Sequence, residues 1–504
     1  MIAHHAEADK ARILQPLVAE LTQYVHRAGQ QALPAHEVER ALWTRVLAIG
    51  RQALGLFFHL QGTGDLGETL ELPDGLAVHR LEQTHARRYR SVFGDFTLHR
   101  TAYGSREGQK IAFVPLDARL QLPVSDYSYL LQEWDGALGC EFAFARVGIT
   151  LFDVLGLKQS TDCLERLNRQ MAQQVAPFRQ SRPLPLAAEE AEVVVIQADG
   201  KGIVMRRAAD CPTILEHCRK GPKVDQKRMA VVGAIYSVDR LERTAQEVVE
   251  SLFRDPKDER PKGPKRPEPV GKHLWASLSH QRDGQEVSGT DVVFGWLHEE
   301  LARRNPKQKR EVVYLMDGQQ SLWDARREYL PGDDAVEILD LLHVTPRLWQ
   351  AAHLFHKERS EEAVAFVRER LGQVLAGRVG YVVGGLRQMG TKRGLTGAKA
   401  KRLQVLCGYL KKNAGRMRYD QYLAKGYPIA SGVIEGACRH YVKDRMERAG
   451  MHWSKEGAQA MLDVRSEYLN GDWEKFQQYR IEQETKRLYP YQQLLDAVQW
   501  TLAA

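Results

Sequence analysis

The sequence contains few cysteines, and their spacing excludes two common kinds of small, cross-linked domain. Six cysteines are scattered over 504 residues, at positions 140, 163, 211, 218, 407 and 438. No two of them form a Cys-x-x-Cys pair, so neither a zinc ribbon nor a disulfide framework is predicted. The pattern is typical of reduced cysteines in a cytosolic protein.

Long apolar runs are also missing. No segment approaches about 18 consecutive apolar residues, and the N-terminal MIAHHAEADKARIL lacks the apolar stretch of a signal peptide. We therefore expect a cytoplasmic protein without a membrane partner. Hydrophobic residues at 43% and charged residues at 27% are ordinary for a globular chain, and this length accommodates about two to four domains.

Acidic residues are nearly absent from one stretch. Between Gly377 and Gly426 the sequence has twelve basic residues and a single acid, Asp420, so this stretch carries more positive charge than the +8 of the whole chain. Such concentration favours a nucleic-acid contact, and the alternative is a solvated charged face. The residues assigned to the contact are Arg387, Lys392, Arg393, Lys399, Lys401, Arg402, Lys411 and Lys412.

Two apolar runs end in Asp-Gly. Residues 193–207 read VVVIQADGKGIVMRR, which predicts a buried strand from Val193, a turn at Asp199-Gly200 and a return strand at 203–205. Residues 311–318 read EVVYLMDG and predict a second strand that ends at Asp317. If the two strands are neighbours in one sheet, two like charges lie side by side, and a divalent cation is their usual partner.

A third carboxylate is expected on a helix. Residues 431–453 read SGVIEGACRHYVKDRMERAGMHW, with Ser431 as N-cap and Gly450 as C-terminal stop. Glu435 lies in the first turn, and Arg439 and Lys443 follow it at four-residue intervals on one predicted face. The alternative is an exposed helix stabilised by an ordinary i, i+4 ion pair.

Further strands and helices surround these segments. Residues 229–240 predict a strand, 254–272 a basic loop, and 290–303 a helix that precedes the Asp317 strand. VEILDLLHV, at 336–344, predicts another strand that ends at Asp340 and His343. Residues 346–426 are too many for a loop and predict an inserted helical subdomain.

The segments QADGKGIVMR, VVYLMDGQQSLWD, ILDLLHVTPRLWQAAH and GVIEGACRHYVKDRMERAGMHWSKEGAQAMLDVR resemble DDE transposases of bacterial insertion sequences, of the ISKra type. PLDARLQLPVSDYSYLL and CEFAFARVGITLFDVLG also match, so the resemblance covers residues from about 90 to 470. The segment around Glu435 is its most specific part.

The resemblance implies an RNase H-like core, two Mg²⁺ ions (Mn²⁺ as a substitute) and cut-and-insert DNA chemistry. Asp199, Asp317 and Glu435 match the catalytic, metal-binding set, and His343, Arg439 and Lys443 are kept as supporting residues. The implied partners are double-stranded DNA, at the element's terminal inverted repeats and at the target, and further copies of the chain, as a homodimer or larger assembly on DNA. The implied location is the bacterial nucleoid.

The N-terminal third is predicted to be helical except for one hairpin. Residues 8–32 and 36–61 predict a helical hairpin, and 86–102 a β-hairpin. Residues 141–175 predict a helix that stops at Gly156, a short turn, and a helix capped by Ser160, which is helix-turn-helix architecture. Lys158, Arg166 and Arg169 are its candidate DNA-contacting residues; plain packing of the two helices is the alternative.

The fold expected from these patterns is α+β and multidomain. The expected divisions are a helical N-terminal region (1–85), a β-hairpin segment (86–120), a helix-turn-helix-like unit (121–182), the first part of an RNase H-like mixed-sheet core (190–345), a basic helical insertion (346–426), and the Glu435 helix with C-terminal helices (427–504). Two other functions use the same residues: an RNase H-like nuclease without strand transfer, and a non-catalytic DNA-binding protein derived from a transposase.

Overall fold

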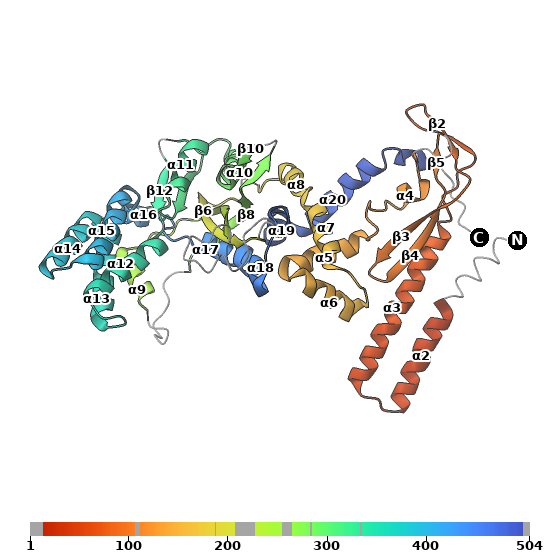
Figure 1. Cartoon of the computed structure of the whole chain (residues 1–504), viewed down its shortest axis with the longest axis horizontal. Coiled ribbons are helices and arrows are strands. Elements are labelled where there is room, and N and C mark those ends of the chain that lie inside the picture. Colours follow the sequence, from red (N-terminus) through yellow and green to blue (C-terminus); the bar gives the residue numbers. More distant parts are fainter. Residues whose placement is uncertain are drawn as a thin grey trace, which may run out of the picture. The chain divides into compact units, whose positions relative to one another are not determined.

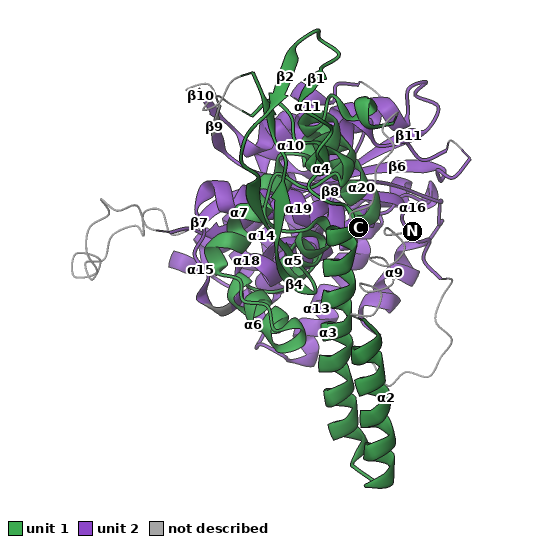
Figure 2. Cartoon of the chain, turned by 90° about the vertical axis from the view of Figure 1, so that its right-hand side faces the viewer, with its two compact units in different colours: residues 1–178, 473–504 green, residues 179–472 purple. Residues whose placement is uncertain are grey.

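The computed structural model describes residues 14–105, 111–186, 188–206, 227–254, 265–282, 285–332 and 335–496. The fold is α+β, and the chain forms two compact units, coloured separately in Figure 2. The first contains residues 1–178 and 473–504, and the second contains residues 179–472. The finer division into six segments stays a prediction.

The first unit starts with the expected helical hairpin, α2 (Leu14–Gln30) and α3 (Ala35–Leu60), which lie side by side in Figures 1 and 2. The expected β-hairpin is also present, as β3 and β4. The remaining bounds in this unit are β1 Thr69–Glu71, β2 Ala77–Arg80, β3 His85–Ser91, β4 Gly94–Arg100, β5 Tyr103–Gly104, α4 Pro115–Arg119, α5 Tyr129–Glu141, α6 Phe144–Leu155, α7 Thr161–Ala172, α20 Trp473–Leu488 and η5 Gln492–Leu495, with α8 (Val175–Ser181) containing the boundary to the second unit.

Helices α6 and α7 have the local features predicted for them. Gly156 ends α6 with a φ of 71°, in the left-handed region that glycine adopts without strain. Ser160 caps α7, since its hydroxyl accepts a hydrogen bond from the Cys163 amide. Leu151 and Leu164 bury the facing sides of the two helices. That this helix pair reads DNA stays a prediction.

The second unit is built on a mixed five-stranded sheet with the order β12-β11-β6-β7-β8. Strands β6, β11 and β12 run parallel, whereas β7 is antiparallel to both β6 and β8. The strand bounds are β6 Val193–Val204, β7 Lys227–Val238, β8 Val270–Leu278, β11 Glu311–Met316 and β12 Val336–Leu339, with a separate pair β9 His280–Arg282 and β10 Gln285–Val287.

The predicted turn at Asp199-Gly200 is wrong. β6 is one unbroken strand of twelve residues that includes both Asp199 and Gly200. These two residues pair with Val232 and Val231 of β7, respectively. Gly200 does not have the positive φ that a tight hairpin turn needs. Pairing with β7 along the whole strand outweighs the local turn preference of Asp-Gly, because the antiparallel ladder of backbone hydrogen bonds continues past both residues.

Helices cover both faces of this sheet. On one face Ile196, Tyr314 and Met316 pack against Phe294 of α10 (Gly289–Arg304) and Trp323 of α11 (Gln320–Tyr329). The other helix bounds in this unit are α9 Ala245–Leu252, α12 Leu341–Phe355, α13 Glu361–Leu375, α14 Val379–Lys392, α15 Gly397–Lys412, η2 Ala414–Arg416, α16 Tyr419–Ala424, α17 Gly432–Ala437, the π-helix η3 Cys438–Lys443, α18 Asp444–Met446, η4 Arg448–Gly450 and α19 Lys455–Leu469.

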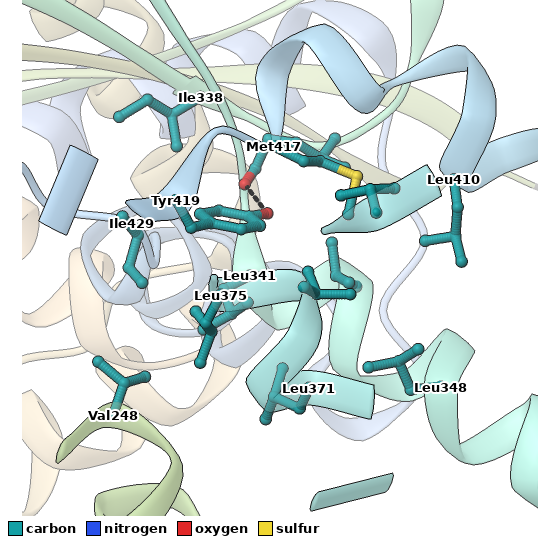
Figure 3. Packing of buried hydrophobic residues seen from close by; sticks show 14 of the residues in the cluster. Val248, Ile338, Leu341, Leu348, Leu371, Leu375, Leu410, Met417, Tyr419 and Ile429 are labelled. Carbon is teal, nitrogen blue, oxygen red and sulfur yellow. Dashed lines mark hydrogen bonds between the residues drawn. The ribbon is translucent and has the colours of Figure 1, made fainter. Parts of the chain in front are cut away.

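The helices after residue 346 share one core with the other face of the sheet. Val195, Leu315 and Ile338 of the strands belong to the same buried cluster as Leu371 and Leu410 of the helical region. Figure 3 shows part of this cluster around Tyr419, whose hydroxyl donates to the Leu339 carbonyl at 2.6 Å. The helical region therefore packs on the sheet rather than projecting from it.

Two further expectations need correction. The strand expected at 336–344 ends at Leu339, and Asp340 then caps α12, so His343 lies in the first turn of a helix. Of the loop expected at 254–272, residues 255–264 lie outside the described residues, and 270–272 belong to β8. Among the described residues, no helix is long and apolar enough to cross a membrane.

Replacement of Gly200 by Ala tests the corrected strand. A Cβ at Gly200 would lie 2.9 Å from the Cε atom of Met229, the end of a flexible and exposed side chain. We expect a change in unfolding free energy within about 0.5 kcal/mol, whereas alanine in a positive-φ turn would cost about 1 kcal/mol or more.

Gly233→Ala on β7 is the matched control. Its Cβ would lie 2.6 Å from Cγ1 of buried Val293, so overpacking should cost about 1–3 kcal/mol. Urea unfolding of both variants measures the difference. Equal destabilisation of the two would contradict the strand assignment at Gly200.

Candidate active site

Asp199 and Asp317 lie level with each other on neighbouring strands. In the parallel pair β6 and β11, Ile196 is the partner of Tyr314. Asp199 comes three residues after Ile196, and Asp317 comes three residues after Tyr314. Burial raises the pKa of Asp317, and the nearby Asp199 carboxylate raises it further. The structure thus brings together the two aspartates predicted from the Asp-Gly pattern.

The loop after β11 fixes the position of Asp317. The Gln319 amide donates to Asp317 Oδ1 at 2.8 Å, and the Trp323 indole donates to the Asp317 carbonyl at 2.7 Å. Gly318 lies against Tyr409 of α15, where any Cβ would overlap the tyrosine ring. Glycine is therefore required at this close approach, which holds the loop against the helical region.

Glu435 reaches the same end of the sheet from α17. The Ile434 amide donates to the buried Gln197 side chain of β6 at 3.0 Å, which ties the first turn of α17 to the strand that carries Asp199. The Glu435 side chain is 46% exposed. Partial burial raises its pKa, and the carboxylates of Asp340 and then Asp199 raise it further.

The segment after Glu435 is not the regular helix predicted for residues 431–453. It changes from α17 to the π-helix Cys438–Lys443 and then to short α- and 3₁₀-helical turns, ending at Gly450 with a φ of 67°. That Arg439 and Lys443 share a face with Glu435 stays a prediction. Both basic residues are exposed.

Ser431 does not cap the Glu435 helix with its side chain, contrary to the prediction. Its hydroxyl donates to Asp340 Oδ2 and its amide donates to Asp340 Oδ1 at 3.1 Å. Asp340, 1% exposed, also accepts from the Leu342 amide at 3.0 Å as the cap of α12. Burial raises the pKa of Asp340 despite these hydrogen bonds.

His343 lies between Asp340 and Glu435. Its Nε2 atom is 3.7 Å from Asp340 Oδ2 and 4.0 Å from Glu435 Oε1. Arg347, one turn further along α12, donates to the His343 carbonyl at 2.9 Å and stacks its guanidinium 3.6 Å from the centre of the Tyr409 ring. His343 is thus a neighbour of both carboxylates, and its supporting role stays a prediction.

Sequence reasoning missed three residues of this cluster: Asp340, Arg347 and Cys438. The Cys438 thiol donates to Asp199 Oδ2 at 3.4 Å, and burial together with that carboxylate raises the pKa of the thiol. An Asp that ends a strand and begins a helix, in LDLLH, was the available signal for Asp340. For Cys438 and Arg347 the sequence offered no signal except that they lie close to Glu435 and His343, respectively, along the chain.

The predicted DNA-contacting residues are exposed. All of the assigned cations of α14, α15 and the turn between them face solvent. In the first unit Arg166 and Arg169 are exposed on α7, and Arg169 forms a 2.6 Å ion pair with Glu165. Lys158 lies 5.7 Å from the centre of the Phe152 ring.

The chain was compared with protein-family models, curated proteins and solved structures. No family model matches the chain, and no curated protein matches it. A solved structure described as the Drosophila P element transposase strand transfer complex matches at 10% sequence identity and a TM-score of 0.24, covering 70% of this chain and 80% of that chain. A TM-score this low does not establish a shared fold.

Asp317→Asn should stabilise the protein in the absence of divalent cations. The folded-state pKa of Asp317 is raised, so its ionisation opposes folding. The penalty is absent below the ordinary pKa of about 4, grows as the pH rises through the folded-state pKa, and is full above it. Relief of such a penalty is typically worth about 0.5–2 kcal/mol.

Urea unfolding midpoints from pH 4 to pH 8, in the presence of EDTA, measure this difference. The exposed Glu358→Gln variant is the control and should follow the wild type throughout. An Asp317→Asn protein that gains nothing as the pH rises would show that neither burial nor the Asp199 charge opposes the ionisation of Asp317 in the folded chain.

Proposed function

We propose that this chain is a DDE-type transposase of an insertion sequence, of the ISKra type, with an RNase H-like core. One observation carries the proposal: Asp199, Asp317 and Glu435 come from β6, the end of β11 and α17, and meet at one end of a mixed sheet. Three carboxylates from distant segments have no structural need to be neighbours, and the Asp199 charge disfavours the ionisation of both Asp317 and Glu435.

The donor set fits divalent cations. Burial raises the pKa of Asp317 and of Glu435, and neighbouring carboxylates raise both further: Asp199 acts on Asp317, and Asp340 and Asp199 act on Glu435. Carboxylate oxygens are the ligands that Mg²⁺ prefers. Asp199, Asp317 and Glu435 would hold the two Mg²⁺ ions, or Mn²⁺ in their place, and such ions activate water and stabilise the leaving oxygen of a phosphodiester.

The protein's own groups would orient the DNA around this centre. Arg439 and Lys443 are exposed on the segment that follows Glu435 and would hold phosphates beside the scissile bond. Hydrolysis at the element end frees a 3′ hydroxyl, and the same in-line displacement with that hydroxyl in place of water joins the end to target DNA. One site serves both steps because both are phosphoryl transfers.

Basic residues on α14 and α15 supply the grip on duplex DNA in this proposal. Lys392, Arg393, Lys401 and Arg402 are exposed on the second unit, which also carries the carboxylates. Phosphate contacts of this kind are independent of sequence. Assembly as a homodimer or larger complex on the element ends belongs to the proposal as well.

Recognition of the terminal repeats is assigned to α7. Arg166 and Arg169 are three residues apart and exposed, so both are available to guanine edges in a major groove. The Arg169–Glu165 ion pair must open before Arg169 can contact a base. Arg166 takes no part in that ion pair, so it is the stronger candidate for a contact with a base.

The three carboxylates should be indispensable for chemistry but not for DNA binding. We expect Asp199→Asn, Asp317→Asn and Glu435→Gln each to reduce strand cleavage at least about 1,000-fold, because each removes a ligand charge. Asp444→Asn, which changes a partly exposed carboxylate of α18, should keep cleavage near the wild-type level.

The measurement is Mg²⁺-dependent cleavage and joining of labelled DNA, alongside binding of the same DNA. Near-normal cleavage by any of the three variants would remove that residue from the site. Cleavage without joining by the wild type would favour a nuclease, and binding without cleavage would favour a non-catalytic descendant.

Removal of basic residues from α15 should weaken binding to every duplex. We expect Lys401→Ala with Arg402→Ala to flatten the plot of log affinity against log salt by about 0.9 units for each phosphate that is no longer neutralised. Lys307→Ala with Lys309→Ala, exposed lysines between α10 and β11, is the matched control. An unchanged slope in the α15 variant would identify the basic stretch as a solvated face.

A further inference from the structure

Three side chains beside the proposed catalytic aspartates form a second set of possible metal ligands, which shares Glu435 with the first. One oxygen each of Asp340 and Glu435 and one ring nitrogen of His343 lie within 4.8 Å of one another. Two of the separations run from His343 Nε2, 3.7 Å to Asp340 and 4.0 Å to Glu435. These distances need only a small contraction to place the three atoms around one ion, at about 2.0–2.2 Å each.

The set is held in place before any ion arrives. Asp340 is 1% exposed and accepts hydrogen bonds from the Ser431 amide, the Ser431 hydroxyl and the Leu342 amide. Each carboxylate oxygen has two lone pairs, so Oδ2 retains one for a cation. The bonds to Ser431 also fix the start of α17, which carries Glu435. Outer hydrogen bonds of this kind orient metal ligands.

One side of the set is buried and the other is open. His343 is 31% exposed and Glu435 is 46% exposed, in contrast to Asp340. Three protein ligands with an open side leave coordination positions for water or substrate oxygens, as catalytic metal sites do. An ion can therefore enter from solvent without displacing part of the fold.

We propose that Asp340, His343 and Glu435 form a divalent-cation site with mixed oxygen and nitrogen ligands, which takes Mn²⁺ in preference to Mg²⁺. Imidazole is a poor ligand for the hard, strictly oxygen-seeking Mg²⁺ and a good one for first-row transition metals. The inference goes beyond the proposed function by adding Asp340 and His343 as ligands of the ion that Glu435 holds and by giving that ion as Mn²⁺; the part of this ion in DNA cleavage rests on that function.

Electron spin-echo envelope modulation of bound Mn²⁺ tests the site directly. The technique detects ¹⁴N of an imidazole that coordinates the ion, and it needs neither DNA nor catalysis. The full-length protein is loaded with less than one equivalent of Mn²⁺. It carries His4→Gln and His5→Gln, because these two consecutive histidines could otherwise bind the ion and contribute nitrogen. We expect imidazole modulation, and little displacement of the ion by a tenfold excess of Mg²⁺.

His343→Gln should abolish the ¹⁴N modulation and weaken Mn²⁺ binding about tenfold or more, the scale of effect for disturbed metal ligation. His440→Gln is the matched control, because His440 is an exposed histidine of the neighbouring π-helix and already pairs with Asp444 at 2.9 Å. The control should keep the modulation. Since His343 is partly exposed, its replacement leaves the buried core intact.

Absence of modulation in the starting protein, or its persistence in His343→Gln, would overturn the proposal, as would an equal loss in His440→Gln. The result is separable from the proposed function. Nitrogen coordination in a protein that never cleaves DNA would contradict only the transposase assignment, and cleavage without nitrogen coordination would contradict only the metal site.

Discussion

The buried carboxylate of Asp340 is the constraint on which the site depends. Its hydrogen bonds to Ser431 join two helix starts that are 91 residues apart in sequence. One of these helices carries His343 and the other carries Glu435. A carboxylate at 1% exposure is costly unless hydrogen bonds satisfy it, so the two helix starts cannot separate without leaving a buried charge unpaired.

The helical region between these helices contributes to the site by packing. It shares its buried cluster with the sheet, and Tyr409 of α15 presses on Gly318, next to Asp317. The loop with Asp317 is thus bounded by the sheet below it and by α15 beside it. One rigid helix, α15, carries basic residues on its exposed side and Tyr409 on its inner side. It therefore lies between the charged surface and the loop with Asp317.

The sequence allowed prediction of those parts of the fold that local pattern determines. The apolar run before Asp317 and the helical hairpin at the N-terminus followed from periodicity and end signals. The side-chain cap predicted for Ser431 was wrong, because its hydroxyl donates to Asp340 instead. The turn predicted at Asp199-Gly200 was also wrong, because pairing with β7 decides between strand and turn there. The partner residues Val231 and Val232 lie beyond the reach of any dipeptide rule.

The π-helix after Glu435 also depends on distant residues. Its carbonyls at His440 and Tyr441 accept hydrogen bonds from the buried Arg465 side chain of α19, at 2.7 and 3.1 Å. These bonds satisfy backbone oxygens that a regular helix would satisfy internally. The candidate site shows the same division: its three carboxylates were proposed from the Asp-Gly and helix patterns together with the family resemblance, whereas Asp340 and Cys438 were recognised only through contacts.

The order of the strands in the sheet has a consequence for synthesis. β6 is central, and its two neighbours are made at different times: β7 follows soon after, but β11 begins only at Glu311. At translation rates of about 5–20 residues per second, the edge of β6 that β11 will cover stays open for on the order of ten seconds. During that interval the run Val193–Ile196 presents unpaired backbone and valine side chains, the features by which one nascent chain adds to another.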